Sequence, residues 1–215
     1  MDAEYPFMAM LRKQTPFVLG ALLACSLWVS GQASNTAPAV PVDQEPKHRA
    51  VFRNDFVRIL DATLPAGYVT LNHTHAVDNV AVTISNGRAG DAALAGVGRA
   101  GFSKGGYSHV VTNSGPGVMR YIVVEPFKTD RPEAMPATLP HHTLEMENGR
   151  VRIYRVRLAA GESLDAHSHP AGSVEVTVTG PDGPGAWLWV AGGEDHPLRV
   201  GAGQPALNLV EVEPK

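Results

Sequence analysis

The segment GYVTLNHTH at residues 67–75 recurs 94 residues later as GESLDAHSH at residues 161–169, with the glycine and both histidines in the same register. Aligned at this offset without a gap, residues 48–83 and 142–177 share 13 identities over 36 positions, which is too many to be accidental. A repeat at a fixed spacing defines the folding unit of a chain. The sequence therefore predicts two copies of one domain, each carrying a His-x-His pair.

Short apolar alternations surround both histidine pairs. Val80, Val82 and Ile84 follow the first pair, and valines at 174, 176 and 178 follow the second. A period of two residues is typical of strands, and the frequent glycine and proline residues between these segments are typical of tight turns. Residues i and i+2 of a strand share a face, so each His-x-His should present two imidazoles side by side. The fold class predicted from this pattern is all-β.

Each repeat contains a third histidine in a second shared pattern. His109 follows Gly106 by three residues in repeat 1, and His196 follows Gly193 by three residues in repeat 2. Two segments that are independent in sequence thus carry the same arrangement of glycine and histidine. We expect the third histidine to join the pair of its own repeat.

These two patterns together resemble the motifs of the cupin superfamily, which read G-x5-H-x-H-x3–4-E-x6-G and G-x5-P-x-G-x2-H-x3-N. Repeat 1 matches them at Gly67, His73, His75, Gly87, Gly98, Gly106, His109 and Asn113. Repeat 2 matches them at Gly161, His167, His169, Gly180, Gly185, Gly193 and His196. The resemblance implies two tandem cupin-type barrels, each a jelly roll or double-stranded β-helix, and hence a bicupin.

Both repeats depart from the family pattern at its metal-binding glutamate. The glutamate position falls on Asn79 or Val80 in repeat 1 and on Ser173 or Val174 in repeat 2. Glu175 is the nearest carboxylate, but its register corresponds to Ala81. We expect that Glu175 could serve as a ligand only if the loop at residues 170–172 shifted the strand.

The resemblance implies a metal site in each barrel, with His73, His75 and His109 as ligands in repeat 1 and His167, His169 and His196 in repeat 2. Neutral imidazoles suit divalent transition metals. Fe(II) is favoured, with Mn, Zn, Ni or Cu as alternatives. Three neutral ligands leave the full charge on the metal and leave coordination positions open, which favours an anionic chelating ligand.

Two functions remain open on this basis. The first is an O₂-dependent dioxygenase, a metal-dependent oxidoreductase acting on a small chelating molecule through the site of repeat 1, because the superfamily includes oxygenases with three-histidine iron sites. The second is a non-catalytic envelope protein that binds a metal, a sugar or an organic acid. The sequence leaves undecided whether the protein is an enzyme.

Several residues near the motifs are candidates for accessory roles. Tyr107 and Tyr121 flank the second motif of repeat 1 and could point into the barrel, while Asn113 is expected to hold a turn. His48 and His142, which are also related by the repeat, are expected to be structural.

Glu125 and Glu213, each followed by proline, are expected to be solvated strand ends. Repeat 1 is expected to carry the ligand or substrate, because it keeps Asn113 where repeat 2 has Val200 and has more residues between its two motifs.

The N-terminal region is predicted to direct export. Arg12 and Lys13 precede an apolar run at residues 17–29, and small residues lead to a cleavage site after Ala33. A lipobox ending at Cys25 is the alternative, although the apolar run continues beyond it. The predicted location is periplasmic or secreted, in a bacterial envelope.

The predicted organisation is a signal peptide at 1–33, a Pro-rich tether at 34–47, cupin domain 1 at 48–127, a linker at 128–141 and cupin domain 2 at 142–215. The net charge is −3 with no basic run, which argues against a nucleic-acid partner. The apolar run is too short for a typical membrane span, so no stable span is expected in the mature chain. The expected partner is a small molecule, and a homodimer or a sheet shared between repeats is possible by analogy.

Overall fold

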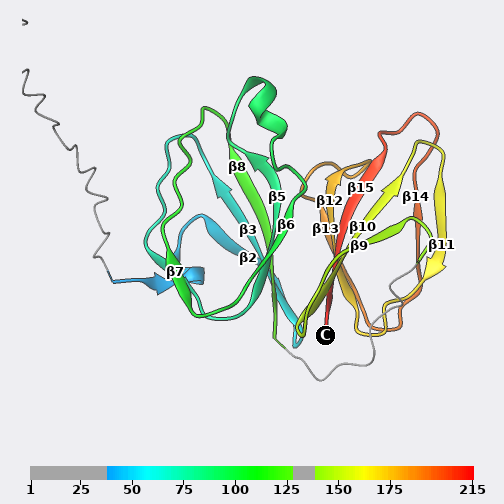
Figure 1. Ribbon diagram of the computed structural model, residues 1–215, viewed down its shortest axis with the longest axis horizontal. Coiled ribbons are helices and arrows are strands. Elements are labelled where there is room, and N and C mark those ends of the chain that lie inside the picture. Colours follow the sequence, from blue (N-terminus) through cyan, green and yellow to red (C-terminus); the bar gives the residue numbers. More distant parts are fainter. Residues whose placement is uncertain (1–37, 128–138) are drawn as a thin grey trace, which may run out of the picture. The chain divides into compact units, whose positions relative to one another are not determined.

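The computed structural model describes residues 38–127 and 139–215, and this part of the chain is built from strands with two short 3-10 helices (Figure 1). These helices are η1 (Val42–Gln44) and η2 (Gly90–Leu94). The all-β prediction is confirmed. The expected signal segment, the start of the expected tether and most of the expected linker lie outside the described residues. Within the described ranges, no helix is long and apolar enough to cross a membrane.

Repeat 1 folds into a five-stranded and a three-stranded sheet. The larger sheet has the order β2 (His48–Arg53), β3 (Val57–Leu64), β8 (Met119–Pro126), β5 (Asn79–Asn86) and β6 (Ala100–Ser103). The smaller sheet has the order β1 (Val40–Pro41), β4 (His73–His75) and β7 (Tyr107–His109). Strands of both sheets line one cavity, so the two sheets enclose a barrel interior, called barrel 1 below.

Repeat 2 reproduces this topology as barrel 2. Its five-stranded sheet has the order β9 (His142–Glu147), β10 (Val151–Leu158), β15 (Leu207–Pro214), β12 (Ser173–Thr179) and β13 (Trp187–Val190). Its smaller sheet pairs β11 (Ser163–His167) with β14 (His196–Arg199). Equivalent strands occupy equivalent places, which confirms two tandem cupin-type barrels as the fold.

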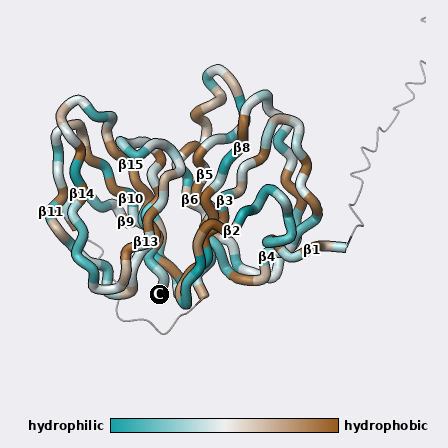
Figure 2. Tube along the Cα trace, turned by 180° about the vertical axis from the view of Figure 1, so that it is seen from behind, coloured by the Kyte–Doolittle hydropathy of each residue, from teal (hydrophilic) through white to brown (hydrophobic). Residues whose placement is uncertain are grey.

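Alternation along the strands assigns each residue to one of two buried faces. In β5, Val80, Val82 and Ile84 pack into an apolar cluster on one face, whereas Asn79 and Ala81 line the barrel cavity on the other. Hydrophobic colouring accordingly marks β3, β5, β10 and β15 (Figure 2). β5, which is buried on both faces, accordingly carries no charged residue.

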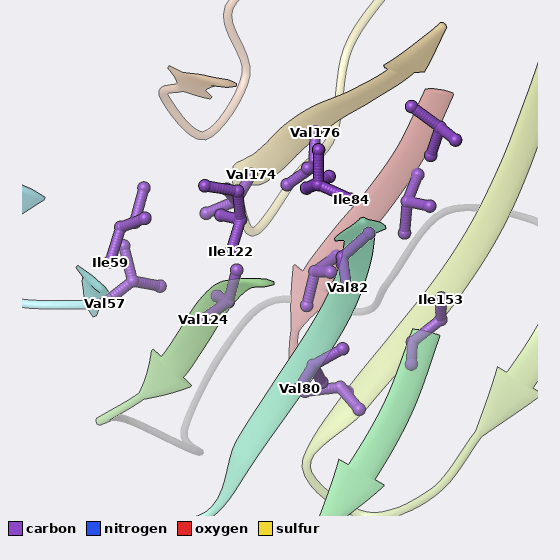
Figure 3. Packing of buried hydrophobic residues seen from close by; sticks show 14 residues of the cluster. Val57, Ile59, Val80, Val82, Ile84, Ile122, Val124, Ile153, Val174 and Val176 are labelled. Atoms are coloured by element: carbon purple, nitrogen blue, oxygen red, sulfur yellow. The ribbon is translucent and has the colours of Figure 1, made fainter. Parts of the chain in front are cut away.

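The apolar cluster joins the two larger sheets face to face. It contains seven residues from each repeat, at equivalent positions (Figure 3): Val57, Ile59, Val80, Val82, Ile84, Ile122 and Val124, with Val151, Ile153, Val174, Val176, Val178, Val210 and Val212. The sequence analysis considered pairing of edge strands between the repeats. The structure instead joins them through the outer faces of the sheets, because the valines and isoleucines that alternate with lumen residues need an apolar partner.

Asn113 and Gly87 form the turn framework of barrel 1. The buried Asn113 side chain donates to the carbonyls of Leu64, Pro65 and Gly117. Gly87 has a φ of 73°, and a Cβ there would lie 2.2 Å from Asn113 Oδ1. Asn113 therefore stabilises these turns, as expected. Only glycine fits at position 87, opposite the Asn113 side chain.

Candidate metal centres in the two barrels

Antiparallel pairing brings the three predicted histidines of barrel 1 together. In the register of β4 and β7, His73 lies opposite His109, and His75 lies opposite Tyr107. The Nε2 atoms of His73 and His109 are 3.0 Å apart, and the ring of His75 lies 5.3 Å from each of the other two rings. The strand pair thus gathers the histidines of both motifs on one face.

His48, which the sequence analysis took as structural, lies in the same cluster. It is the first residue of β2, it is 6% exposed, and its ring is 4.5 Å from that of His73. One donor atom from each of His48, His73 and His75 falls within 4.8 Å of the others, a grouping that could hold a metal ion. The signal for His48 was present in the sequence as its match to His142 in the repeat.

Backbone carbonyls fix the orientation of several rings. Nδ1 of His73 donates to the carbonyl of Leu71 at 2.9 Å, and Nδ1 of His167 donates to that of Asp165 at 3.2 Å. In both cases the acceptor lies two residues before the histidine. A proton held on Nδ1 leaves the lone pair on Nε2, the atom that would bind a metal.

Burial keeps His48, His73 and His109 neutral at neutral pH. Desolvation, assisted by the neighbouring imidazoles, lowers the pKa of His48 to about 3 and that of His109 to about 4. Burial also lowers the pKa of His73, although the hydrogen bond to Leu71 opposes the shift. Neutral imidazole is the form that binds metals, so these residues are ready as ligands at neutral pH.

Glu125 lies beside His75, and its position shows that one prediction was wrong. It was expected to be a solvated strand end, but it is fully buried, with Oε1 3.6 Å from His75 Nδ1 and Oε2 2.5 Å from Arg58 Nε. Burial would raise the pKa of Glu125, but hydrogen bonds from His75 and Arg58 outweigh burial and lower it. The alternation of β8 places this residue on the lumen side, where a carboxylate needs such partners. Glu213, expected to be solvated for the same reason, is also fully buried.

Barrel 2 gathers its histidines in the same way. His167 on β11 lies opposite His196 on β14, and His169 follows β11 with no exposed surface. Donor atoms of these three residues and of Glu211 all lie within 4.8 Å of one another. His142 Nε2 lies 3.0 Å from Glu211 Oε2. The second cluster therefore contains a carboxylate that the sequence analysis missed.

The carboxylates of barrel 2 occupy lumen positions that are apolar in barrel 1. Glu175 lies opposite Glu211 in the pairing of β12 with β15, where barrel 1 pairs Ala81 with Val123. Glu175 Oε1 is 2.9 Å from His196 Nε2. We had expected that a loop shift would be needed to bring Glu175 to the site. That expectation was wrong, because the register shared with Ala81 already points the side chain into the barrel.

The protonation of barrel 2 differs from that of barrel 1. Burial would lower the pKa of His142 and of His196, but hydrogen bonds to Glu211 and Glu175 respectively outweigh it and raise both pKa values. Burial would raise the pKa of Glu211, yet hydrogen bonds from His142 and His167 lower it to about 2. His169 has a pKa lowered to about 4, chiefly by burial. Barrel 2 thus combines imidazoles with the ionised carboxylate of Glu211, whereas burial lowers the pKa of three imidazoles in the barrel 1 cluster, those of His48, His73 and His109.

A cavity of about 280 Å³ opens on the cluster of barrel 1. It is lined by His48, Ala62, Leu64, His75, Asn79, Ala81, Ser103, Tyr107, His109, Val111, Tyr121 and Val123. Tyr107 and Tyr121 therefore both line the interior, as the sequence analysis considered. In barrel 2 a cavity of about 270 Å³ is lined by polar residues that include Glu175 and Arg199, together with Pro181 and three leucines.

Asn79 stands at the position of the family glutamate and contacts Tyr107. The Asn79 amide donates to Tyr107 Oη at 3.3 Å, and the Tyr107 ring stacks on that of His75 at 5.1 Å. An aromatic ring and two polar groups are thus fixed beside the histidines at the wall of the cavity.

The fold and the clusters define the class of protein: a two-barrel cupin-type chain with one histidine cluster of metal-binding composition in each barrel. No family model matches the sequence, and no curated protein matches it.

Solved structures with similar folds include the following three proteins. A cupin 2 conserved barrel domain protein from Leptotrichia buccalis is 11% identical, with 77% of this chain and 87% of that chain covered and a TM-score of 0.42. Salicylate 1,2-dioxygenase from Pseudaminobacter salicylatoxidans is 10% identical, with 78% and 76% covered and a TM-score of 0.46. The polyketide cyclase RemF from Streptomyces resistomycificus is 21% identical, with 41% and 76% covered and a TM-score of 0.31.

Proposed function

We propose that the protein is an exported metal-dependent bicupin in which barrel 1 binds a divalent transition metal and oxidises a small chelating molecule with O₂. His73, His75 and His109 would hold the metal, with His48 as a further ligand. The observation that carries the proposal is the cluster of buried neutral imidazoles that opens on a cavity of about 280 Å³.

When bound, the metal would supply Lewis-acid and redox chemistry toward O₂ and an anionic chelator. The residues present in barrel 1 fit such a group, because the imidazoles of His48, His73 and His109 have lowered pKa values and offer lone pairs to a metal. Fe(II) is favoured for O₂ chemistry, with Mn, Zn, Ni or Cu as alternatives. Without a carboxylate in the cluster, a chelating anion such as an enolate, carboxylate or thiolate would supply the compensating charge.

The cavity wall indicates how a substrate would be held. Ala62, Leu64 and Val123 exclude water from one side, so the bound molecule should be compact and largely apolar. Tyr107 Oη accepts a hydrogen bond from the Asn79 amide at 3.3 Å and donates to Asn79 Oδ1 at 3.5 Å, and its proton would turn from this longer bond to an oxygen of the bound molecule. The volume of about 280 Å³ lies just below the range for small-molecule pockets, about 300–1,000 Å³, so the bound molecule should be small.

The proposal is tested by metal content and oxygen uptake of the full chain. Elemental analysis of protein purified without a tag or chelator should find a divalent transition metal, and His73→Ala or His109→Ala should remove about one ion per chain. The iron-loaded protein should consume O₂ with a member of a panel of β-diketones, thiols and catechols. Tyr107→Phe is the matched control, because it keeps the ring stacked on His75 and should lower turnover without removing the metal.

Two outcomes would overturn parts of the proposal. Unchanged metal content in both histidine variants would show that barrel 1 is not a metal site. Bound iron with neither oxygen uptake nor a spectral change across the panel would replace the dioxygenase with a non-catalytic binding protein for a metal, sugar or organic acid.

Export is tested separately, because residues 1–33 lie outside the described part of the chain. Protein purified from the cell envelope should have the intact mass of a chain beginning near Ser34. A mass that carries acyl groups at Cys25 would indicate a lipoprotein, and a mass that retains the N-terminal segment would indicate an anchor.

A further inference from the structure

Residues 40–45 lie against the strand that carries two of the barrel 1 histidines. β1 pairs in parallel with β4, with Val40 beside His73, and Val40 N donates to the carbonyl of Asn72 at 2.9 Å. Val42, which is 2% exposed, packs with Leu60 and Val123. These residues fall in the segment expected to be a tether, yet they form part of the wall of barrel 1.

Glu45 is the buried anchor of this segment. Its side chain accepts hydrogen bonds from Lys47 N at 3.0 Å, from Tyr68 Oη at 2.9 Å and from Leu71 N at 2.7 Å. The residue is 1% exposed. A carboxylate in such a position holds its donors firmly, because each hydrogen bond is assisted by its charge.

The backbone of Leu71 links this anchor to the cluster. Its N–H donates to Glu45, and its carbonyl accepts the Nδ1 proton of His73 at 2.9 Å. That second bond fixes both the rotation of the His73 ring and the tautomer that leaves Nε2 free. Groups that orient a metal-binding histidine in this way typically change metal affinity by about 10- to 100-fold when they are removed.

A second connection runs from the same segment to His75. Asp43 Oδ2 lies 3.3 Å from Arg58 Nη1, and Arg58 binds the buried Glu125 that faces His75. Asp43 is half exposed, so its contribution should be the weaker of the two. Both connections begin within three residues of each other, at Asp43 and Glu45.

We infer that residues 40–45 are part of the barrel 1 site, with Glu45 acting through Leu71 as a positioning residue for His73. The inference rests on the proposed metal site. Barrel 2 is an internal comparison, because the residue 94 positions after Glu45 is Leu139, which has no carboxylate. Loss of the anchor should therefore affect one barrel alone.

The test compares metal affinity and ring tautomer in Glu45 variants of the full chain. Titration of metal-free protein with Co²⁺ should show barrel 1 binding weakened about 10- to 100-fold in Glu45→Ala, with barrel 2 unchanged. Each barrel is assigned in a background in which the other lacks its His-x-His pair. Glu45→Gln, which keeps an acceptor oxygen for Leu71 N, should restore most of the affinity. Asp55→Asn, an exposed change on the β2–β3 turn, is the control.

A ¹⁵N spectrum of the metal-free protein reads the tautomer of His73 directly. The Nδ1-protonated form should dominate in the wild type and Glu45→Gln and become mixed in Glu45→Ala. If Glu45→Ala does not fold, Glu45→Asp, whose carboxylate is one methylene too short to reach Leu71, takes its place with the same expected result.

Unchanged affinity and an unchanged tautomer in the variant would overturn the inference, as would an equal loss of affinity in both barrels. Absence of Co²⁺ binding to wild-type barrel 1 would instead refute the proposed metal site, and the tautomer measurement would still decide whether Glu45 positions His73.

Discussion

His48 and His142 are the first residues of β2 and β9. In the metal-free protein they should make the free energy of unfolding depend on pH in opposite directions. His48 has a folded-state pKa of about 3 against 6.5 in the unfolded chain. Below pH 6.5 the unfolded chain therefore takes up a proton at this site that the folded chain does not, and the free energy of unfolding falls as the pH falls. pH 5 is 1.5 units below the pKa in the unfolded chain. At about 1.4 kcal/mol per unit, the free energy of unfolding at pH 5 is therefore lowered by about 2 kcal/mol.

His142 is the matched comparison from the other repeat. Its pKa is raised in the folded protein, so the stability it contributes is fully present below pH 6.5 and is lost as the pH rises through the folded value. The pKa of Glu211, its partner, is lowered to about 2, so that carboxylate does not titrate between pH 5 and 8. The two histidines thus act on opposite sides of pH 6.5 and with opposite sign.

The assay is urea unfolding followed by tryptophan fluorescence, in chelator, at intervals from pH 5 to pH 8. In His48→Gln, the free energy of unfolding should fall by about 2 kcal/mol less than in the wild type between pH 7 and pH 5. His142→Gln should leave the acid side unchanged and remove a decline above pH 6.5. Curves parallel to the wild type in both variants would refute the assignment of these protonation states.

Three further predictions concern the second site, a turn and the shared core. Glu211→Gln should weaken metal binding in barrel 2 by about 10- to 100-fold and leave barrel 1 unchanged, measured by Co²⁺ titration; equal loss in both barrels would contradict it. Gly87→Ala should cost about 3 kcal/mol or more in urea unfolding, because its Cβ would meet Asn113, whereas Gly67→Ala, at the same φ of 73° but with nothing within 4 Å, should cost about 1 kcal/mol. Val176→Ala, at a fully buried position of the shared core, should cost about 2 kcal/mol, and a cost below 0.5 kcal/mol would show that this layer is not tightly packed.

The parts of the fold that the sequence predicts are those determined by local periodicity. The alternation at Val80, Val82 and Ile84 is enough to indicate a strand, and the i, i+2 spacing of His73 and His75 is enough to place both on one face. The repeat then extends these conclusions to the second barrel without further information.

The residues that the sequence analysis misread depend on pairing between distant strands. Glu211 faces Glu175 only through the register of β15 with β12, two strands that β13 and β14 separate in the sequence. Glu45 lies in a Pro-rich segment whose composition is typical of a tether, and its burial follows from the pairing of β1 with β4. Composition and spacing carry no information on such pairings, so these residues could not be assigned from the chain alone.

The layer of valines and isoleucines between the larger sheets has a consequence for how the two sites can differ. Equivalent residues of the two repeats meet there, as they do across the two-fold axis of a symmetric dimer. In a dimer of identical chains, a glutamate introduced in one lumen appears in the other as well. Within a single chain the same packing leaves each lumen free to change alone, so that Glu175 and Glu211 can fill one barrel while Ala81 and Val123 keep the other open.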